Sequence, residues 1–205
     1  YIQAIRQVRP NGPYYLGGFS FGGFVAYEMA RQLATQGQEV ALLAILDTQA
    51  GAAPGFRQGL SQWQVLRYRA RSTFERTRYN LGILRQLPPG ERLAYTRRKP
   101  QQPSLREVIM GDVQDEQVPE HLRGVIEANL AALKNYVPKA YPGRVTLFKS
   151  KDHGGGVYYG WNELAARGVE IFEVPGNHRG IVQEPNVRIL AEQLQACIDR
   201  TLLEK

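Results

Sequence analysis

The chain has 205 residues, of which 43% are hydrophobic, and a formal net charge of +7. This length suits one or at most two compact domains with a buried core, and there is no apolar run of about 18 residues that would predict a membrane span. The single cysteine excludes an internal disulfide and fits a reducing, cytoplasmic compartment. The three histidines lie far apart without metal-ligand companions, so no metal or cofactor of its own is expected.

The first 49 residues predict the order helix, strand, helix, strand. Apolar residues at positions 2, 5 and 8 have helical spacing, and the turn at 9–13 ends that helix. A short apolar strand at 14–16 precedes a helical pattern at 22–36, which Gly37 stops. Residues 40–46 are all apolar. A strand that is apolar on both faces predicts a parallel sheet flanked by helices.

The rest of the chain divides into a long helical insertion and a second part of the sheet. Residues 50–140 hold proline and glycine breaks between helical patterns, the clearest at 122–136. Strands are expected at 144–149 and 169–174, with a helix between them and a closing helix from about 185 to 202 that buries Cys197. We therefore expect an α/β fold whose core comprises residues 1–49 and 141–205.

Positive charge is concentrated in the insertion. Residues 57–106 contain twelve Arg or Lys and two Glu. Such a stretch suggests nucleic-acid binding, but no RNP, zinc-finger or helix-turn-helix pattern accompanies it. A solvated helical face and a docking surface for an acidic partner remain the two interpretations.

A candidate nucleophile lies between the first strand and the second helix. Residues 18–22 have the pattern G-x-S-x-G, and in this strand-to-helix context the pattern predicts a nucleophile elbow. We expect side chains at Gly18 and Gly22 to collide in so tight a turn, and Gly23 to let the helix approach the sheet. Ser20 is expected to have a strained backbone and an exposed hydroxyl. A phosphate-binding loop is the rival interpretation, but neither phosphate-loop glycine pattern is present.

A serine hydroxyl needs a general base and a carboxylate that orients it. His178 follows the strand at 169–174, where this fold places the base; His153 is a weaker candidate, and His121 is expected on the surface of the insertion. Asp47 and Asp152 each follow a strand, at the sheet edge where α/β sites form. The residues alone leave both aspartates open as the acid.

Segments near both ends of the chain resemble the C-terminal thioesterase domain of modular nonribosomal peptide and polyketide synthases, in the α/β-hydrolase superfamily. These segments are residues 16–33, 37–43, 46–48, 160–165 and 174–178. The resemblance implies an α/β-hydrolase fold in which residues 50–140 form a helical lid. It also implies that Asp47, rather than Asp152, is the acid of a Ser20–His178–Asp47 triad.

The activity implied by the resemblance is release of an acyl or peptidyl chain from the phosphopantetheine arm of an upstream carrier protein. An acyl-Ser20 intermediate would be resolved by hydrolysis or macrocyclisation. Carrier proteins of such synthases generally present an acidic surface, which the basic insertion could meet. A stand-alone editing thioesterase, a generic esterase and a non-enzymatic basic module are the alternatives.

The amide of Phe21 is expected to donate to the oxyanion, while its side chain, bulkier than expected at this position, narrows the pocket. Only 19 residues precede Ser20, and the first of them is not Met. The resemblance therefore implies that N-terminal strands and the second oxyanion donor lie outside this sequence. On that basis the isolated chain is expected to have weak or no thioesterase activity.

Overall fold

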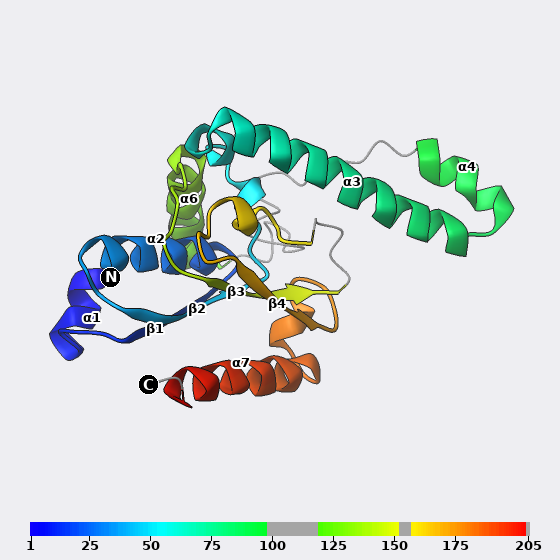
Figure 1. Cartoon of the computed structure of the whole chain (residues 1–205). Coiled ribbons are helices and arrows are strands. Elements are labelled where there is room, and N and C mark those ends of the chain that lie inside the picture. Colours follow the sequence, from blue (N-terminus) through cyan, green and yellow to red (C-terminus); the bar gives the residue numbers. More distant parts are fainter. Residues whose placement is uncertain (98–118, 152–156, 204–205) are drawn as a thin grey trace.

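The computed structural model describes residues 1–97, 119–151 and 157–203. Its centre is a parallel sheet of four strands in the order β1-β2-β3-β4 (Figure 1): β1 Tyr14–Phe19, β2 Val40–Leu46, β3 Val145–Ser150 and β4 Val169–Val174. The strands expected from the sequence are confirmed. Leu46 is in register with both Phe19 and Phe148, so three strands end at one edge of the sheet.

Helices cover both faces of this sheet. Helices α2 (Phe21–Thr35) and α6 (Glu120–Asn135) lie on one face, and α7 (Asn186–Leu203) lies on the other (Figure 1). Alternate residues of β2 enter separate cores: Leu43 and Ile45 pack with α2, while Leu42 and Ala44 pack with α7. This two-sided burial explains why residues 40–46 are apolar without interruption.

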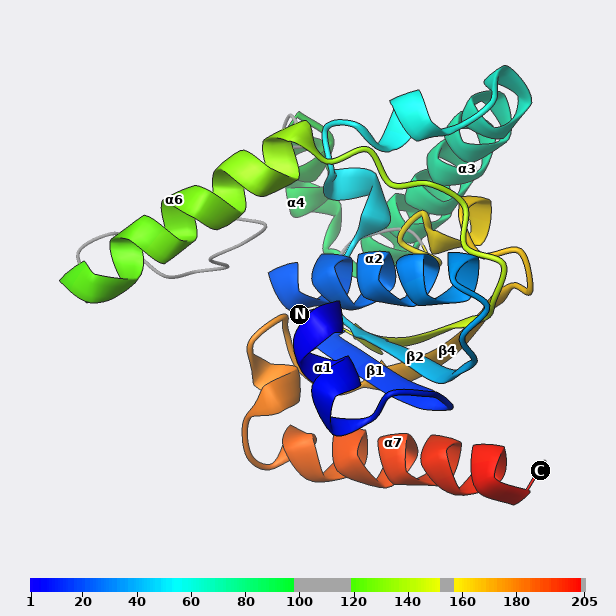
Figure 2. The same ribbon diagram turned by 90° about the vertical axis from the view of Figure 1, so that its left-hand side faces the viewer.

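The described part of the segment between β2 and β3 is mostly helical, although residues 136–144, which lead into β3, are not. After two short 3₁₀ turns it forms α3 (Gln62–Gln86) and α4 (Pro89–Arg97), and it returns through α6. Figure 2 shows α3 and α4 beyond α2, on the same side of the sheet. The boundaries at residues 50 and 140 stay a prediction. Within the described ranges, no helix has the length and apolar character needed to cross a membrane.

A helix lies at each end of the described chain. Helix α1 (Ile2–Val8) precedes β1, and α7 closes the chain from Asn186. Cys197 of α7 is 1% exposed, as expected, and burial raises the pKa of its thiol. A buried thiol with a raised pKa is a packing residue rather than a nucleophile.

The helix expected between β3 and β4 is wrong for the described residues of that connection. Residues 157–168 form turns and one 3₁₀ turn, Trp161–Glu163. Gly160 and Gly168 have φ of +88° and +81°, in the left-handed region that ends a regular helix. Trp161 is fully buried against Phe24 and Tyr27 of α2, so this connection packs as part of the core.

Candidate active site

Ser20 occupies a strained turn between β1 and α2. Its backbone has φ 54° and ψ −123°, as the elbow prediction requires. Asp47 and Tyr159, with φ of 49° and 52°, are the other two non-glycine residues with positive φ in the described part of the chain. Each such residue costs roughly 1–3 kcal/mol and persists only where surrounding contacts hold it. The strain is therefore gathered around one site.

The glycines of the elbow have different roles. A Cβ at Gly18 would overlap the backbone of Gly22, which confirms the collision expected there. The matching expectation for Gly22 is wrong, because a Cβ at Gly22 meets nothing within 4 Å and points into open space. Gly23 is needed because a Cβ there would overlap the side chain of Thr48. The turn is therefore crowded at Gly18, which faces the backbone of Gly22, and at Gly23, which faces Thr48.

Thr48 joins the elbow to the strand that carries Asp47. Its hydroxyl donates to the carbonyl of Ser20 at 2.7 Å, and its own carbonyl accepts from Nε1 of Trp161 at 2.6 Å. The amide of Ser20 donates to the carbonyl of Leu46 at 3.1 Å. These bonds fix the elbow relative to the end of β2.

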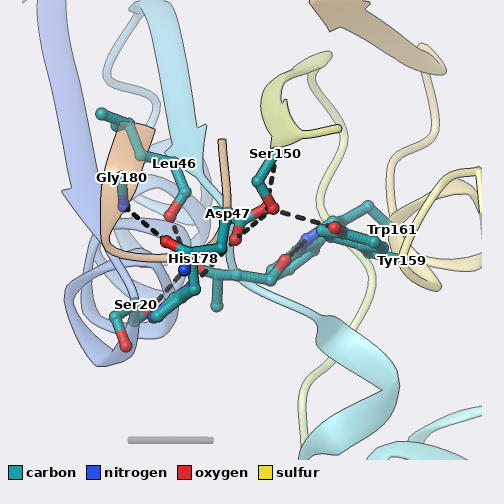
Figure 3. Close-up of polar contacts among 10 residues, drawn as sticks. Ser20, Leu46, Asp47, Ser150, Tyr159, Trp161, His178 and Gly180 are labelled. Atoms are coloured by element: carbon teal, nitrogen blue, oxygen red, sulfur yellow. Dashed lines mark hydrogen bonds and ion pairs between the residues drawn. The ribbon is translucent and has the colours of Figure 1, made fainter. Parts of the chain in front are cut away.

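The carboxylate of Asp47 lies at the centre of a buried set of hydrogen bonds (Figure 3). Its Oδ2 is 2.8 Å from Nδ1 of His178. Ser150 donates its amide to Oδ1 and its hydroxyl to both oxygens, and the hydroxyl of Tyr159 donates to Oδ1 at 3.1 Å. The Asp47 side chain is fully buried, and these hydrogen bonds satisfy its two oxygens. Because the carboxylate can only accept, Nδ1 of His178 is the protonated nitrogen.

The ring of His178 stacks on the ring of Phe19, with centroids 4.7 Å apart and an interplanar angle of 25°. Because Phe19 precedes Ser20, this stacking places the imidazole beside the turn that carries Ser20. The loop after β4 holds the histidine there: Gly176 has φ 93°, and Asn177 accepts a hydrogen bond from the amide of Gly180 at 2.8 Å. The three residues expected from the sequence therefore meet at one edge of the sheet.

A cavity of about 700 Å³ opens beside the elbow, between α1, α2 and α6. It is lined largely by apolar side chains, and Phe21 contributes to its wall as well as to the core. Burial raises the pKa of Glu28 in this wall, but hydrogen bonds from Arg31, Gln32 and Tyr136 and the charge of Arg31 outweigh burial, so the net pKa is lowered. Glu28 is thus an anion whose charge is already matched by Arg31 at 2.7 Å.

The remaining candidates lie elsewhere. Asp152 and His153 are outside the described residues, and His121 is exposed on α6. The sequence reasoning missed Ser150 and Tyr159. Ser150 could have been found from its place at the carboxyl end of β3. Among the described residues, no group of His, Cys, Asp and Glu is placed to hold a metal ion.

A parallel sheet with helices on both faces, a strained Ser20 turn between strand and helix, and a histidine after a later strand define the α/β-hydrolase class. Comparison with known proteins carries the assignment further. Residues 1–88 match the family model described as Thioesterase domain.

Two curated relatives and a solved thioesterase domain match nearly the whole chain. Chondramide synthase cmdD of Chondromyces crocatus is 29% identical over 100% of this chain and 5% of its own length. Non-reducing polyketide synthase atnG of Arthrinium sp is 31% identical over 97% of this chain and 10% of its own length. The thioesterase domain of NocB, solved as a covalent complex with a fluorophosphonate nocardicin G analog, has 27% identity and a TM-score of 0.56 over 98% of this chain and 71% of that one.

Residues 1–88 thus match the thioesterase family, and the chain as a whole is similar to parts of nonribosomal peptide and polyketide synthases and to a solved thioesterase domain. The chain spans only about 5% and 10% of the length of the two synthases just described.

Proposed function

We propose that this domain releases an acyl or peptidyl chain from a carrier protein, with Ser20 as nucleophile, His178 as general base and Asp47 as the acid that orients it. The observation that carries the proposal is the 2.8 Å contact between Asp47 and Nδ1 of His178, beside the strained turn of Ser20. A buried carboxylate that holds an imidazole next to a raised serine is the arrangement that acyl transfer requires.

The reaction proceeds in two acyl transfers. The hydroxyl oxygen of Ser20 attacks the thioester carbonyl while Nε2 of His178 takes its proton, since Nδ1 faces Asp47. The amide of Phe21, at the start of the 15-residue helix α2, donates to the resulting oxyanion. The thiol of the phosphopantetheine arm then leaves with the proton from His178. Water, or an amine or hydroxyl of the bound chain, then attacks the acyl-Ser20 ester with His178 again as base. The bond between the acyl group and the Ser20 oxygen breaks, and His178 returns the proton to that oxygen.

The cavity beside Phe21 is suited to the released chain. Its size, about 700 Å³, falls within the range of small-molecule pockets, and its wall is mostly apolar. We place the acyl or peptidyl portion there. In this proposal the phosphopantetheine arm arrives as part of the substrate, the domain needs no cofactor of its own, and the reaction takes place in the cytoplasm.

A fluorophosphonate probe tests the nucleophile directly. We expect the protein to gain one phosphonyl group on Ser20, detected by mass spectrometry of its peptides, as the fluorophosphonate complex of the NocB thioesterase domain suggests. Ser20→Ala removes the only oxygen of this residue that can react. We expect labelling to disappear in that variant and to fall by at least about 10³-fold in His178→Ala, because the serine then lacks its base. Undiminished labelling in His178→Ala would remove the histidine from the proposal.

The carrier protein is proposed to dock on the insertion. Residues 62–97, which form α3 and α4, contain eight arginines and two glutamates. Arg78 and Arg85 are seven residues apart on α3 and are exposed, so they share one face of the helix. Opposite charges on the two partners would speed their encounter, and added salt would weaken this attraction.

Reversing this charge should affect only substrates that arrive on a carrier. For Arg78→Glu with Arg85→Glu, we expect KM for a carrier-bound thioester to rise about tenfold at low salt, and turnover of a small soluble thioester to stay the same. The matched control is Arg9→Glu with Arg144→Glu, two exposed arginines near the opposite edge of the sheet. If the two double variants behave alike, α3 is not the docking face.

A further inference from the structure

The long helix α3 is fastened to the connection between β3 and β4 through a buried carboxylate. The side chain of Glu163 is fully buried, and its Oε2 accepts from Nε and Nη2 of Arg67 at 3.1 and 2.7 Å. Gln64 donates to the carbonyl of Glu163 at 2.9 Å, and Asn162 donates to Oε1 at 2.6 Å. Because a buried carboxylate without partners is strongly unfavourable, these bonds hold residue 163 and α3 together.

Two more contacts from α3 reach the beginning of the same connection. The carboxylate of Glu75 accepts from the amide of Val157 at 2.9 Å, and the guanidinium of Arg71 lies 5.0 Å from the ring centroid of Tyr158. Together with the two α3 residues that hold Glu163, they are spaced three or four positions apart and share one face of the helix. Residues 157–163 are therefore held against α3 at both ends.

Tyr159 lies in the middle of this segment and points to the triad. It is buried, its hydroxyl donates to Oδ1 of Asp47 at 3.1 Å, and its carbonyl accepts from the amide of Gly51 at 3.2 Å. Burial and, next, the charge of Asp47 raise the pKa of the phenol well above its usual value. The hydroxyl thus remains a donor wherever the enzyme works. Its backbone φ of 52° is strained and depends on the contacts around it.

The carboxylate of Asp47 serves two sides of the site. Oδ2 faces His178, whereas Tyr159 donates to Oδ1, and Ser150 donates to both oxygens. The other charged groups near the phenol are Lys149, whose ammonium lies 5.4 Å from its ring centroid, and Glu173 of β4. A donor on Oδ1 fixes the plane of the carboxylate and draws negative charge away from His178.

We propose that Tyr159 is a positioning residue that acts through Asp47, and that α3 sets the place of Tyr159 through Glu163. This inference rests on the proposed role of Asp47 as the acid. The insertion then influences the general base without touching it: a displacement of α3 moves residues 157–163, and the phenol moves with them. The position of α3 is thereby linked to the orientation of the carboxylate that holds His178.

Tyr159→Phe in the full-length protein tests the first half of this proposal. We expect kcat to fall about tenfold with KM unchanged, because a hydrogen bond to a charged group is lost away from the substrate. The acid limb of the kcat/KM profile should move to higher pH, because a carboxylate with one donor fewer stabilises the imidazolium more. Tyr158→Phe is the matched control: it keeps the ring under Arg71 and should leave both quantities unchanged.

Glu163→Gln tests the second half. We expect a fall in kcat of about threefold in the otherwise unchanged protein and no further fall when Tyr159→Phe is already present, since both act through one hydroxyl. Arg67→Gln replaces this variant if it does not fold. The proposal would be overturned if the losses in kcat from Glu163→Gln and Tyr159→Phe multiplied in the double variant. It would also be overturned if Tyr159→Phe had the same kcat and pH profile as Tyr158→Phe. Failure of the fluorophosphonate to label Ser20 in the parent protein would instead overturn the proposed function.

Discussion

Asp47→Asn is expected to lower kcat by about 10⁴-fold while the fold is retained, because an asparagine amide cannot hold the imidazole in the tautomer that accepts the serine proton. The asparagine would also turn an NH₂ group toward donors that now bond to a carboxylate, either Ser150 and Tyr159 or His178. Steady-state turnover of a carrier-bound thioester and of a soluble thioester should both show the loss. Circular dichroism measures whether the variant is folded.

Asp152→Asn is the control for that variant. Asp152 was the other aspartate that the residues left open as the acid. Because Asp47 makes the contact with His178, we expect replacement of Asp152 to change kcat by less than about twofold. A large loss in Asp152→Asn together with a small loss in Asp47→Asn would reverse the assignment of the acid.

Gly18→Ala is expected to destabilise the protein by about 3 kcal/mol and to abolish labelling of Ser20. A Cβ at Gly18 would overlap the backbone of Gly22, and backbone atoms in a tight turn cannot move aside without displacing the start of α2. The serine hydroxyl would be displaced with it. Denaturation by urea measures the loss of stability, and the fluorophosphonate probe measures the loss of reactivity.

Gly22→Ala is the matched partner of this variant. Its Cβ would point into open space within α2, so we expect a neutral effect or stabilisation by about 0.5–1 kcal/mol, because alanine favours a helix more than glycine does. The two glycines of the same motif should therefore respond in opposite directions. Equal losses at both positions would mean that the whole turn, rather than the side facing Gly18, is sterically closed.

The sheet and the elbow could be predicted because their signals are local. The apolar run at 40–46 indicates burial on two faces, and the G-x-S-x-G pattern has meaning through the strand before it and the helix after it. The position of His178 followed from the rule that this fold places its base after a late strand. The choice of Asp47 over Asp152 did not follow from the residues and came only with the resemblance.

Other parts of the site depend on contacts that no local pattern records. Tyr159 reaches Asp47 across 112 positions of the chain, and Ser150 across 103. The helix expected between β3 and β4 was wrong because left-handed glycines and the burial of Trp161 outweigh helical preference there. Gly22 was misjudged for a similar reason: a pattern shows that glycine occurs at a position, but only the packing shows which side of the turn is crowded.

Three residues of the site have a strained backbone that the stability of the fold does not explain. At Ser20, Asp47 and Tyr159 the backbone has a conformation that glycine adopts without difficulty and that these side chains resist. Glycine would relieve the strain at each of the three positions. A chain with glycine there would lack the hydroxyl, the carboxylate and the phenol, together with the buried packing of Tyr159 and the hydrogen bonds of Asp47. The trade-off between stability and activity in this protein therefore falls on three named backbone positions, and stabilising changes should be sought elsewhere.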